Sequence, residues 1–167
     1  MRKYKRTCPK SSRTIGVLGE AFATEVLTDA FDCEVLQYGG TVKAFDLLCV
    51  IYDKDEAYTF MVQVKAQYKG KYTKGGKALK TGVKDKKVKW LASLPLPTYV
   101  AGVDYEGDVM YLAPVFDADL KFDNISVKYK FERHLFEYAD LLKEDVMEYW
   151  RSVNIRDHKA TYNSKLV

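Results

Sequence analysis

Two extended runs on either side of a short polar break, within residues 43–65, constrain the fold of this chain more than any other feature. The runs read KAFDLLCVIY and AYTFMVQVK, and residues 53–56 between them are all charged. Extended runs joined by such a break predict a β-hairpin, with Lys54 and Asp55 as a two-residue loop.

That loop determines which residues of the two strands face each other. Asp53 then pairs with Glu56, and counting along the ladder places Asp46 opposite Gln63. Because side chains alternate across a strand, Gln63 and Lys65 share one face, and directly opposed Cβ atoms lie about 5 Å apart. The hairpin therefore predicts that a carboxylate, an amide and an ammonium group meet at one point of a sheet, partly buried. The alternative is that Asp46 and Lys65 stand in water at strand ends.

The remaining hydrophobic patterns predict an α/β fold, a mixed sheet flanked by helices. The order helix, strand, strand, strand, helix, strand implies an antiparallel hairpin joined to a strand that returns through a helix, with an extra strand and helix toward the C-terminus. The expected elements are helix 14–31, strand 33–38, the hairpin, helix 83–93 after a flexible glycine-rich loop, strands 98–103 and 109–113, edge strand 126–131 and helix 138–150.

The first helix carries two glutamates that border its apolar stripe. Apolar and small residues recur at helical spacing from Ile15 to Ala30, which predicts one broad face against a core. At about 100° per residue, Glu20 and Glu25 fall on opposite borders of this face, so the two cannot serve one site. Gly19 would let the helix approach the sheet closely, and either glutamate is alternatively a solvated flank residue.

One domain accounts for nearly the whole chain of 167 residues. We expect a basic arm at 1–13, a single domain at 14–153 and a polar tail at 154–167. No apolar run approaches the roughly 20 residues that span a bilayer, and none follows the basic N-terminus, so a cytoplasmic protein without a membrane partner is expected. Three scattered cysteines and two histidines disfavour disulfide frameworks and zinc sites.

Positive charge is concentrated in the first half of the chain. Residues 1–90 hold 18 Lys and Arg against 10 Asp and Glu, whereas residues 91–167 hold 9 against 13. Such segregation suits a polyanionic partner, although solvated lysine-rich loops give the same pattern. Tyr68, Tyr72 and Trp90 either stack on bases or line the core, and packing in the core or at its rim is favoured for Trp90. The expected nucleic-acid contacts are Arg2, Lys3, Lys5 and Arg6 in the arm, and Lys69, Lys71, Lys74, Lys77, Lys80, Lys84, Lys86, Lys87 and Lys89 beyond the hairpin.

The hairpin residues and the order of elements resemble those of the PD-(D/E)XK nuclease superfamily, which has the restriction-endonuclease-like fold. The matching residues are Gly19 and Glu20 on the first helix, Asp46 at the start of the second strand and Gln63-Val64-Lys65 on the third. The last three form the QxK variant of the usual D/ExK motif, as in Mrr-like restriction enzymes and some homing endonucleases. The resemblance covers residues 14–113. The chain departs from the family pattern in lacking a proline before Asp46 and in having Gln63 for an acid, which removes one negative charge from the metal site.

The resemblance implies a metal-dependent DNA endonuclease that hydrolyses phosphodiester bonds. The Asp46 carboxylate, the Gln63 amide oxygen and the Val64 main-chain carbonyl would be hard oxygen ligands for Mg²⁺, with Mn²⁺ as a substitute. Glu20 would bind a second metal ion or a water molecule, and Lys65 would orient the nucleophile or neutralise developing charge. The expected catalytic set is therefore Glu20, Asp46, Gln63 and Lys65.

Several readings of the biological activity stay open at this level. The cut would be sequence-specific, of the restriction or homing type, or structure-selective, as in Holliday-junction resolvases, and DNA is favoured over RNA. A homodimer or higher homo-oligomer is expected, because one site cuts one strand. The alternatives are a nucleic-acid-binding module with a nuclease-like fold and little or no activity, and a lysine-rich interaction protein without nucleic acid.

Overall fold

The computed structural model describes residues 11–31, 33–38, 45–115, 123–135 and 137–157. Within these ranges the chain forms three helices and eight strands. Their bounds, in chain order, are α1 (Ser12–Phe31), β1 (Glu34–Tyr38), β2 (Leu47–Asp53), β3 (Glu56–Gln67), β4 (Ala78–Lys80), α2 (Asp85–Ala92), β5 (Thr98–Asp104), β6 (Val109–Pro114), β7 (Asn124–Ser126), β8 (Lys130–Glu132) and α3 (Ala139–Asp157).

Six of the strands form one mixed sheet, in the spatial order β1-β2-β3-β5-β6-β8, while β4 and β7 pair in a second, two-stranded sheet. Strands β3 and β5 run parallel, and all other neighbours in the large sheet are antiparallel. The parallel pair is connected through α2, as a parallel connection requires a crossover. The expected α/β fold with a mixed sheet flanked by helices is confirmed, and β4 is inserted between β3 and α2.

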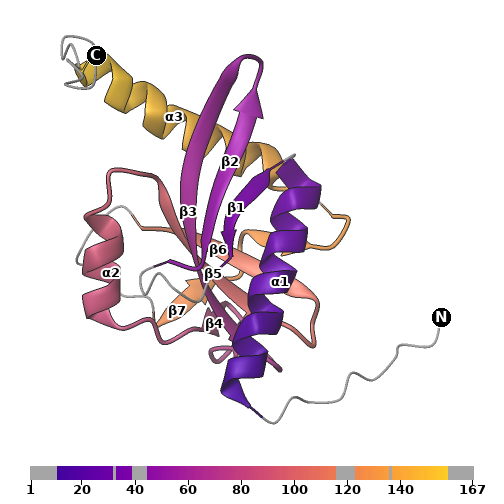
Figure 1. Cartoon of the computed structure of the whole chain (residues 1–167). Coiled ribbons are helices and arrows are strands. Elements are labelled where there is room, and N and C mark those ends of the chain that lie inside the picture. Colours follow the sequence, from indigo (N-terminus) through magenta and orange to yellow (C-terminus); the bar gives the residue numbers. More distant parts are fainter. Residues whose placement is uncertain (1–10, 32, 39–44, 116–122, 136, 158–167) are drawn as a thin grey trace.

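The hairpin of β2 and β3 is the longest feature of the sheet and projects beyond its neighbours (Figure 1). Helix α3 runs beside the projecting part. Lys143 of α3 lies 3.0 Å from the carboxylate of Asp53 at the hairpin loop, and the Trp150 indole N–H donates to the Thr59 carbonyl at 2.9 Å. These contacts hold the far end of the hairpin against the C-terminal helix.

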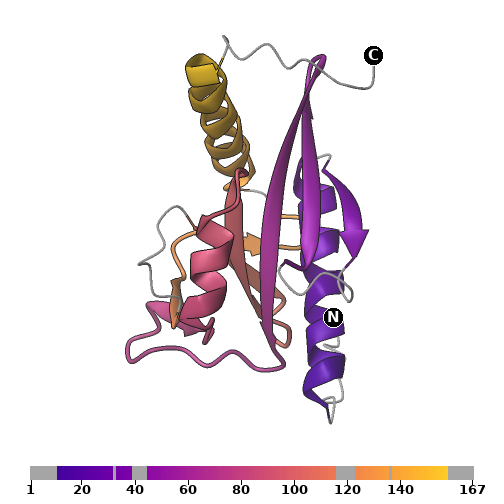
Figure 2. The same cartoon turned by 60° about the vertical axis from the view of Figure 1, so that its left-hand side comes forward.

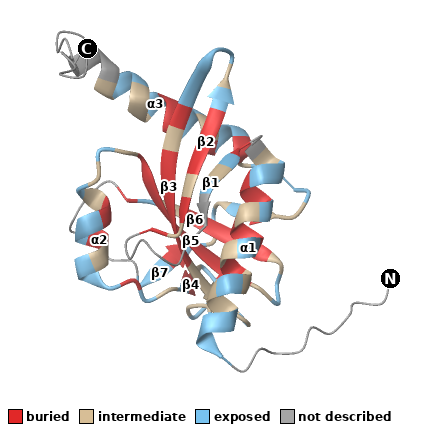
Figure 3. Ribbon diagram, in the orientation of Figure 1, coloured by how far each residue is buried: buried red, intermediate tan, exposed pale blue. Residues whose placement is uncertain are grey.

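Two apolar clusters lie on the two faces of the large sheet. On one face, α1 and α3 pack against alternate residues of β2, β3 and β5, such as Cys49, Phe60 and Ala101. On the other face, α2 and the β4–β7 pair pack against Met61 and Val100. Helices α1 and α2 accordingly stand on opposite sides of the central strands (Figure 2), and the middle of the sheet is buried on both sides (Figure 3). Burial on both faces explains why these strands are apolar almost throughout.

Helix α1 approaches the sheet closely at Gly19, as its sequence predicts. A Cβ atom at position 19 would overlap the Cβ atom of Ala66 on β3. Phe22, Val26 and Leu27 in the middle of the stripe are fully buried, so the expected face of the helix is confirmed. The close approach brings the neighbouring Glu20 toward the end of β3.

Two expectations about the chain after β3 are wrong. The predicted edge strand 126–131 is two short strands, β7 and β8, which belong to different sheets. Alternation of polar and apolar residues indicates a pleated segment but cannot show that the chain crosses from one layer to another within it. The glycine-rich stretch after β3 is not a structureless loop either, because it contains β4, and Leu79 of that strand is completely buried.

The first and last helices extend past the limits 14–153 that the sequence predicts for the domain. Helix α1 begins at Ser12, inside the predicted arm, and α3 extends to Asp157, beyond the predicted start of the polar tail. Residues 1–10 of the arm and 158–167 of the tail lie outside the described residues. In the part of the chain that is described, no helix is both long and apolar enough to cross a membrane.

The close approach of α1 predicts opposite effects for two glycine substitutions on the same helix. Gly19→Ala should lower the free energy of unfolding by about 1–3 kcal/mol, because a strand backbone position cannot yield to the added methyl group. Gly16→Ala should leave stability unchanged or raise it by about 0.5–1 kcal/mol, because nothing lies within 4 Å of a Cβ atom there and alanine favours the helix. Urea unfolding of both variants is the measurement, and equal effects would contradict the packing described.

Candidate active site

The hairpin has the register that its sequence predicts. Asp53 pairs with Glu56, and the ladder continues to Leu47 opposite Val62. One step further the Asp46 N–H donates to the Val62 carbonyl at 3.1 Å, which leaves Asp46 beside Gln63. Lys54 adopts a positive φ of 55° in the two-residue loop, as a tight hairpin turn requires.

The Asp46 carboxylate is hydrogen-bonded to two consecutive residues of β3. Its Oδ2 atom accepts the Val64 main-chain N–H at 2.7 Å and also a proton of the Gln63 amide Nε2. The same Nε2 donates to the Val64 carbonyl at 3.0 Å. Gln63 is only 1% exposed, so its amide group is fixed between a carboxylate and a main-chain carbonyl inside the protein.

The other end of the Gln63 amide has no partner. Its Oε1 atom is buried and without a hydrogen bond among the described residues. An unsatisfied buried acceptor costs about 1–3 kcal/mol, so this arrangement calls for a ligand or a rearrangement. Turning the amide by 180° would place Oε1 beside both Asp46 Oδ2 and the Val64 carbonyl. Three oxygens would then converge, and such a group is stable only around a cation.

The residues present therefore fit a hard metal ion better than a soft one. A carboxylate, an amide oxygen and a main-chain carbonyl are the donor types that Mg²⁺ and Mn²⁺ accept. Within the described residues, no group of three or more His, Cys, Asp or Glu side chains gathers to hold a metal. A metal at this site would thus depend on the amide and carbonyl oxygens and on ligands from outside the protein.

Four charged side chains interact electrostatically at the site, three from α1, β3 and α2 and one, Asp46, from the position just before β2. Burial raises the pKa of the Asp46 carboxyl, while the Val64 N–H bond, Lys87 and Lys65 act in the opposite direction. Burial, followed by the negative charge of Asp46, raises the pKa of Glu20, and Lys65 and Lys87 again oppose the shift. The structure thus brings Glu20 and Lys65 to Asp46 and Gln63, as the sequence predicts, and it adds Lys87.

Lys87 belongs to this site rather than only to a basic surface. It lies next to Val88 and one turn before Leu91 on α2, and both of those residues are buried. Lys87 is half-buried while Lys86 is exposed, and burial lowers the pKa of Lys87 despite the opposing charges of Asp46 and Glu20. The spacing of Lys87 from the apolar residues of α2 could have indicated that it lies on the inner side of the helix. That spacing does not show that the inner side covers the hairpin.

The other candidate residues have separate surroundings. Glu25 forms an ion pair with Arg133 at 2.9 Å, which agrees with its placement away from Glu20. The predicted nucleic-acid contacts Arg2, Lys3, Lys5 and Arg6 lie outside the described residues. The exposed lysines of the predicted set are Lys69, Lys71, Lys74, Lys77, Lys80, Lys84, Lys86 and Lys89.

The aromatic candidates divide between the core and the surface. Tyr72 donates a hydrogen bond to the buried carboxylate of Asp104 at 2.8 Å and packs edge-on against the Tyr111 ring, so its ring serves the fold. Trp90 is 39% exposed on α2, where a nucleic-acid base can reach it. Tyr68 lies beside Tyr105, with ring centroids 6.5 Å apart.

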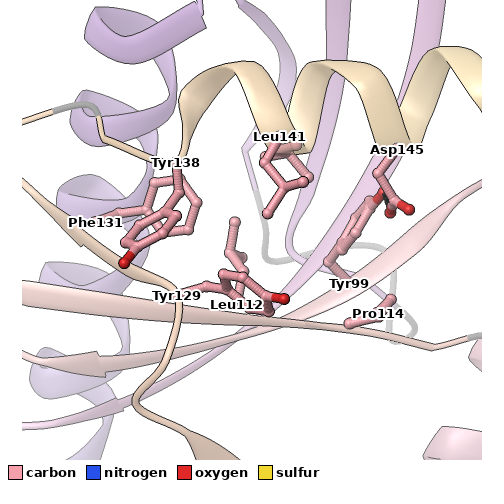
Figure 4. A pocket seen from close by; sticks show the side chains of 9 residues that line it. Tyr99, Leu112, Pro114, Tyr129, Phe131, Tyr138, Leu141 and Asp145 are labelled. Carbon is pink, nitrogen blue, oxygen red and sulfur yellow. Dashed lines mark hydrogen bonds between the residues drawn. The ribbon is translucent and has the colours of Figure 1, made fainter.

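A small cavity of about 190 Å³ lies elsewhere, between α3 and the sheet (Figure 4). Its walls are mostly aromatic and aliphatic, and they include Tyr129, Phe131 and Tyr138. At one end the Tyr99 hydroxyl donates to the Asp145 carboxylate, which satisfies both groups. The cavity contains none of the site residues, so it is separate from the cluster around Asp46.

No protein-family model, curated protein or solved structure matches this chain.

The raised carboxyl pKa values predict how the stability of the protein depends on pH. An acid with a raised pKa in the folded state binds more protons folded than unfolded, so stability falls as pH rises through that window. Asp46→Asn removes the titrating carboxyl and therefore the decrease in stability with rising pH that Asp46 causes. In EDTA the variant should be more stable than wild type near about pH 7, and the advantage should shrink toward about pH 4. Urea unfolding across this range measures the difference.

Asp53 provides a control of opposite sign. A hydrogen bond from Lys143 lowers the pKa of Asp53, so its contribution to stability is present above the ordinary carboxyl pKa and is lost as pH falls. Asp53→Asn should therefore be less stable than wild type at neutral pH, with a deficit that disappears in acid. An advantage of Asp46→Asn that does not vary with pH would contradict the raised pKa of the Asp46 carboxyl.

Proposed function

We propose that this protein is a metal-dependent DNA endonuclease with a restriction-endonuclease-like core. The observation that carries the proposal is the buried Gln63 amide, which bridges Asp46 and the Val64 carbonyl and has an unpartnered oxygen. A binding protein has no need for a half-buried carboxylate with a raised pKa beside the half-buried Lys65 and Lys87, because an anion there repels phosphate.

The order of elements also supports the proposal. The chain from α1 through β5 has the helix, strand, strand, strand, helix, strand order of the PD-(D/E)XK core, apart from the short strand β4. The residues that resemble the family motif come from three of these elements, and their charged members interact with one another.

In this proposal Asp46, Gln63 and the Val64 carbonyl hold Mg²⁺, with Glu20 within electrostatic reach for a second ion. A bound Mg²⁺ would supply charge stabilisation for the phosphoryl oxygens and activate water for attack on phosphorus. Because Gln63 contributes no charge, a phosphate oxygen of the substrate would complete the ligand set. Metal affinity and DNA affinity should therefore increase each other.

The two lysines of the site have different positions and different proposed tasks. Lys65 follows the metal ligands on β3 and shares a face with Gln63, so it neutralises negative charge that develops at the attacked phosphate. Lys87 reaches the site from α2 and interacts with Asp46 and Glu20. Its proposed task is to hold the phosphate against the metal. A homodimer is proposed for cutting both strands of a duplex.

The deciding test is cleavage of supercoiled plasmid, linear duplex, four-way-junction DNA and RNA with Mg²⁺ or Mn²⁺. Wild type should nick at least one DNA substrate, and Asp46→Ala or Lys65→Ala should reduce the rate by about 100- to 1000-fold. Lys54→Asn is the control, because it removes one charge at the hairpin loop and tolerates the positive φ there.

The outcomes separate the candidate functions. Equal nicking by wild type and by both site variants would mean that the assigned residues are not the catalytic ones. Tight, salt-dependent binding without cleavage of any substrate would identify a nucleic-acid-binding module instead.

Lys87 and Lys86 form a matched pair that tests the second lysine. Lys87→Met should lower the cleavage rate on saturating substrate by about 100-fold, because a buried phosphate contact is lost. Lys86→Met should change mainly the salt dependence of binding, by about one phosphate contact. Single-turnover rates and binding titrations measure the two effects. If both variants changed the rate and the salt dependence equally, Lys87 would have no role in the site beyond that of a surface lysine.

A further inference from the structure

The lysine-rich stretch after β3 is an ordered two-stranded ribbon, which we define as residues 69–80. Its strands pair antiparallel through the Thr73 N–H and the Ala78 carbonyl at 2.8 Å and through the Lys80 N–H and the Lys71 carbonyl at 2.8 Å. Gly75 and Gly76 form the tip with φ values of 87° and 69°, which favour glycine. Glycine therefore makes a tight turn here rather than a flexible loop.

The inner face of the ribbon is anchored in the protein. Tyr72, opposite Leu79 in the ribbon, donates to the Asp104 carboxylate at 2.8 Å. Leu79 is completely buried over Gly102 of β5, where a Cβ atom would come within 2.9 Å of the leucine. Strand β7 pairs with the outer edge of β4 through Ile125. The ribbon is thus held in one position on the face of the sheet that α2 also covers.

The ribbon carries five lysines and no acidic residue. The lysines at 69, 71, 74, 77 and 80 are all exposed, and none of them takes part in the ion pairs found among the described residues. Because Tyr72 pairs with Leu79, Lys71 lies directly opposite Lys80. Like charges at opposed positions about 5 Å apart destabilise a ladder. An anionic partner would reverse the sign of this interaction.

Gln67 joins the ribbon to the strand that carries the site. Its Oε1 accepts the Lys71 N–H at 2.9 Å, and its Nε2 donates to the Lys80 carbonyl, so one amide holds both ribbon strands at their base. Gln67 lies two residues after Lys65 on β3 and shares its face. The Gln67 side chain is thus engaged by the main chain of the protein.

We propose that the ribbon is a docking surface for the phosphodiester backbone of duplex DNA, and that Gln67 is the positioning residue that fixes this surface relative to Gln63 and Lys65. The opposed side chains of Lys71 and Lys80 would lie on either side of the DNA backbone, and its phosphates would offset the repulsion between them. The part of this inference that concerns cutting rests on the proposed nuclease function, whereas the part that concerns binding does not.

The binding part is tested without cleavage, with Asp46→Ala protein in EDTA and a fluorescent duplex of mixed sequence. Each phosphate contact contributes about 0.9 to the slope of log affinity against log salt. Lys71→Ala with Lys80→Ala should therefore reduce the slope by about 2, while Lys54→Asn on the distant hairpin loop should not change it. An unchanged slope in the double variant would overturn the docking surface. If the protein bound single-stranded RNA but not duplex DNA, the choice of duplex DNA as the partner would be overturned.

The positioning part is tested by mapping cut positions on an end-labelled duplex. Gln67→Ala should keep DNA affinity within about twofold, because all lysines remain, but should spread the cuts over neighbouring phosphates. Gln67→Glu keeps the acceptor for the Lys71 N–H and loses the donor to Lys80, so its cuts should spread less. A cut pattern identical to wild type in Gln67→Ala would overturn the role of Gln67.

Failure of the proposed function is distinguishable from failure of the docking surface. If wild type cuts no substrate, the nuclease proposal and the positioning role both fall, and the salt slope still decides whether the ribbon binds DNA. If wild type cuts and the slope of the lysine variant is unchanged, the nuclease proposal stands and the ribbon is excluded.

Discussion

The hydrogen bonds that Asp46 accepts from Gln63 and from the Val64 N–H are the interaction on which the site depends. They are made at the first position beyond the β2–β3 ladder, so they exist only in one register of the hairpin. A shift by one residue would turn Gln63 toward the opposite face and remove the bridge. The same shift would expose the apolar residues that pack under α1, which gives the register a large energetic preference. The same register of the β2–β3 hairpin therefore produces both the core packing and the site.

Burial then gives the site its electrostatic character. Partial burial raises the pKa of the Asp46 carboxyl, and full burial leaves the Gln63 amide oxygen without a partner among the described residues. Both are unfavourable in the protein alone and favourable once a cation and a phosphate are present. Lys65 and Lys87 supply positive charge from two different elements, so the cluster is balanced without a direct ion pair to Asp46 among the described contacts.

Sequence reasoning succeeded where a local pattern has one structural solution. The hairpin was predictable because a two-residue loop and alternation of side chains leave a single register, and the α1 stripe was predictable because a helix has one period. It failed at residues 126–131, where alternation could not reveal two strands in different layers. It also took the glycines of the lysine ribbon for a sign of flexibility, because nothing in their neighbourhood shows that Leu79 is buried over Gly102.

The sequence by itself determined the β2–β3 register, the meeting of Asp46 with Gln63 and Lys65, and the faces of α1, because each depends on residues close in the chain or on a single period. Only the tertiary structure decided that Lys87 joins the site, that Gln67 holds the ribbon, and that the Gln63 oxygen is left unpaired. These features arise from contacts between elements far apart in the sequence. Their geometry depends on how closely α2, β4 and β7 pack on the sheet, and side-chain volumes set that packing without leaving a periodic trace.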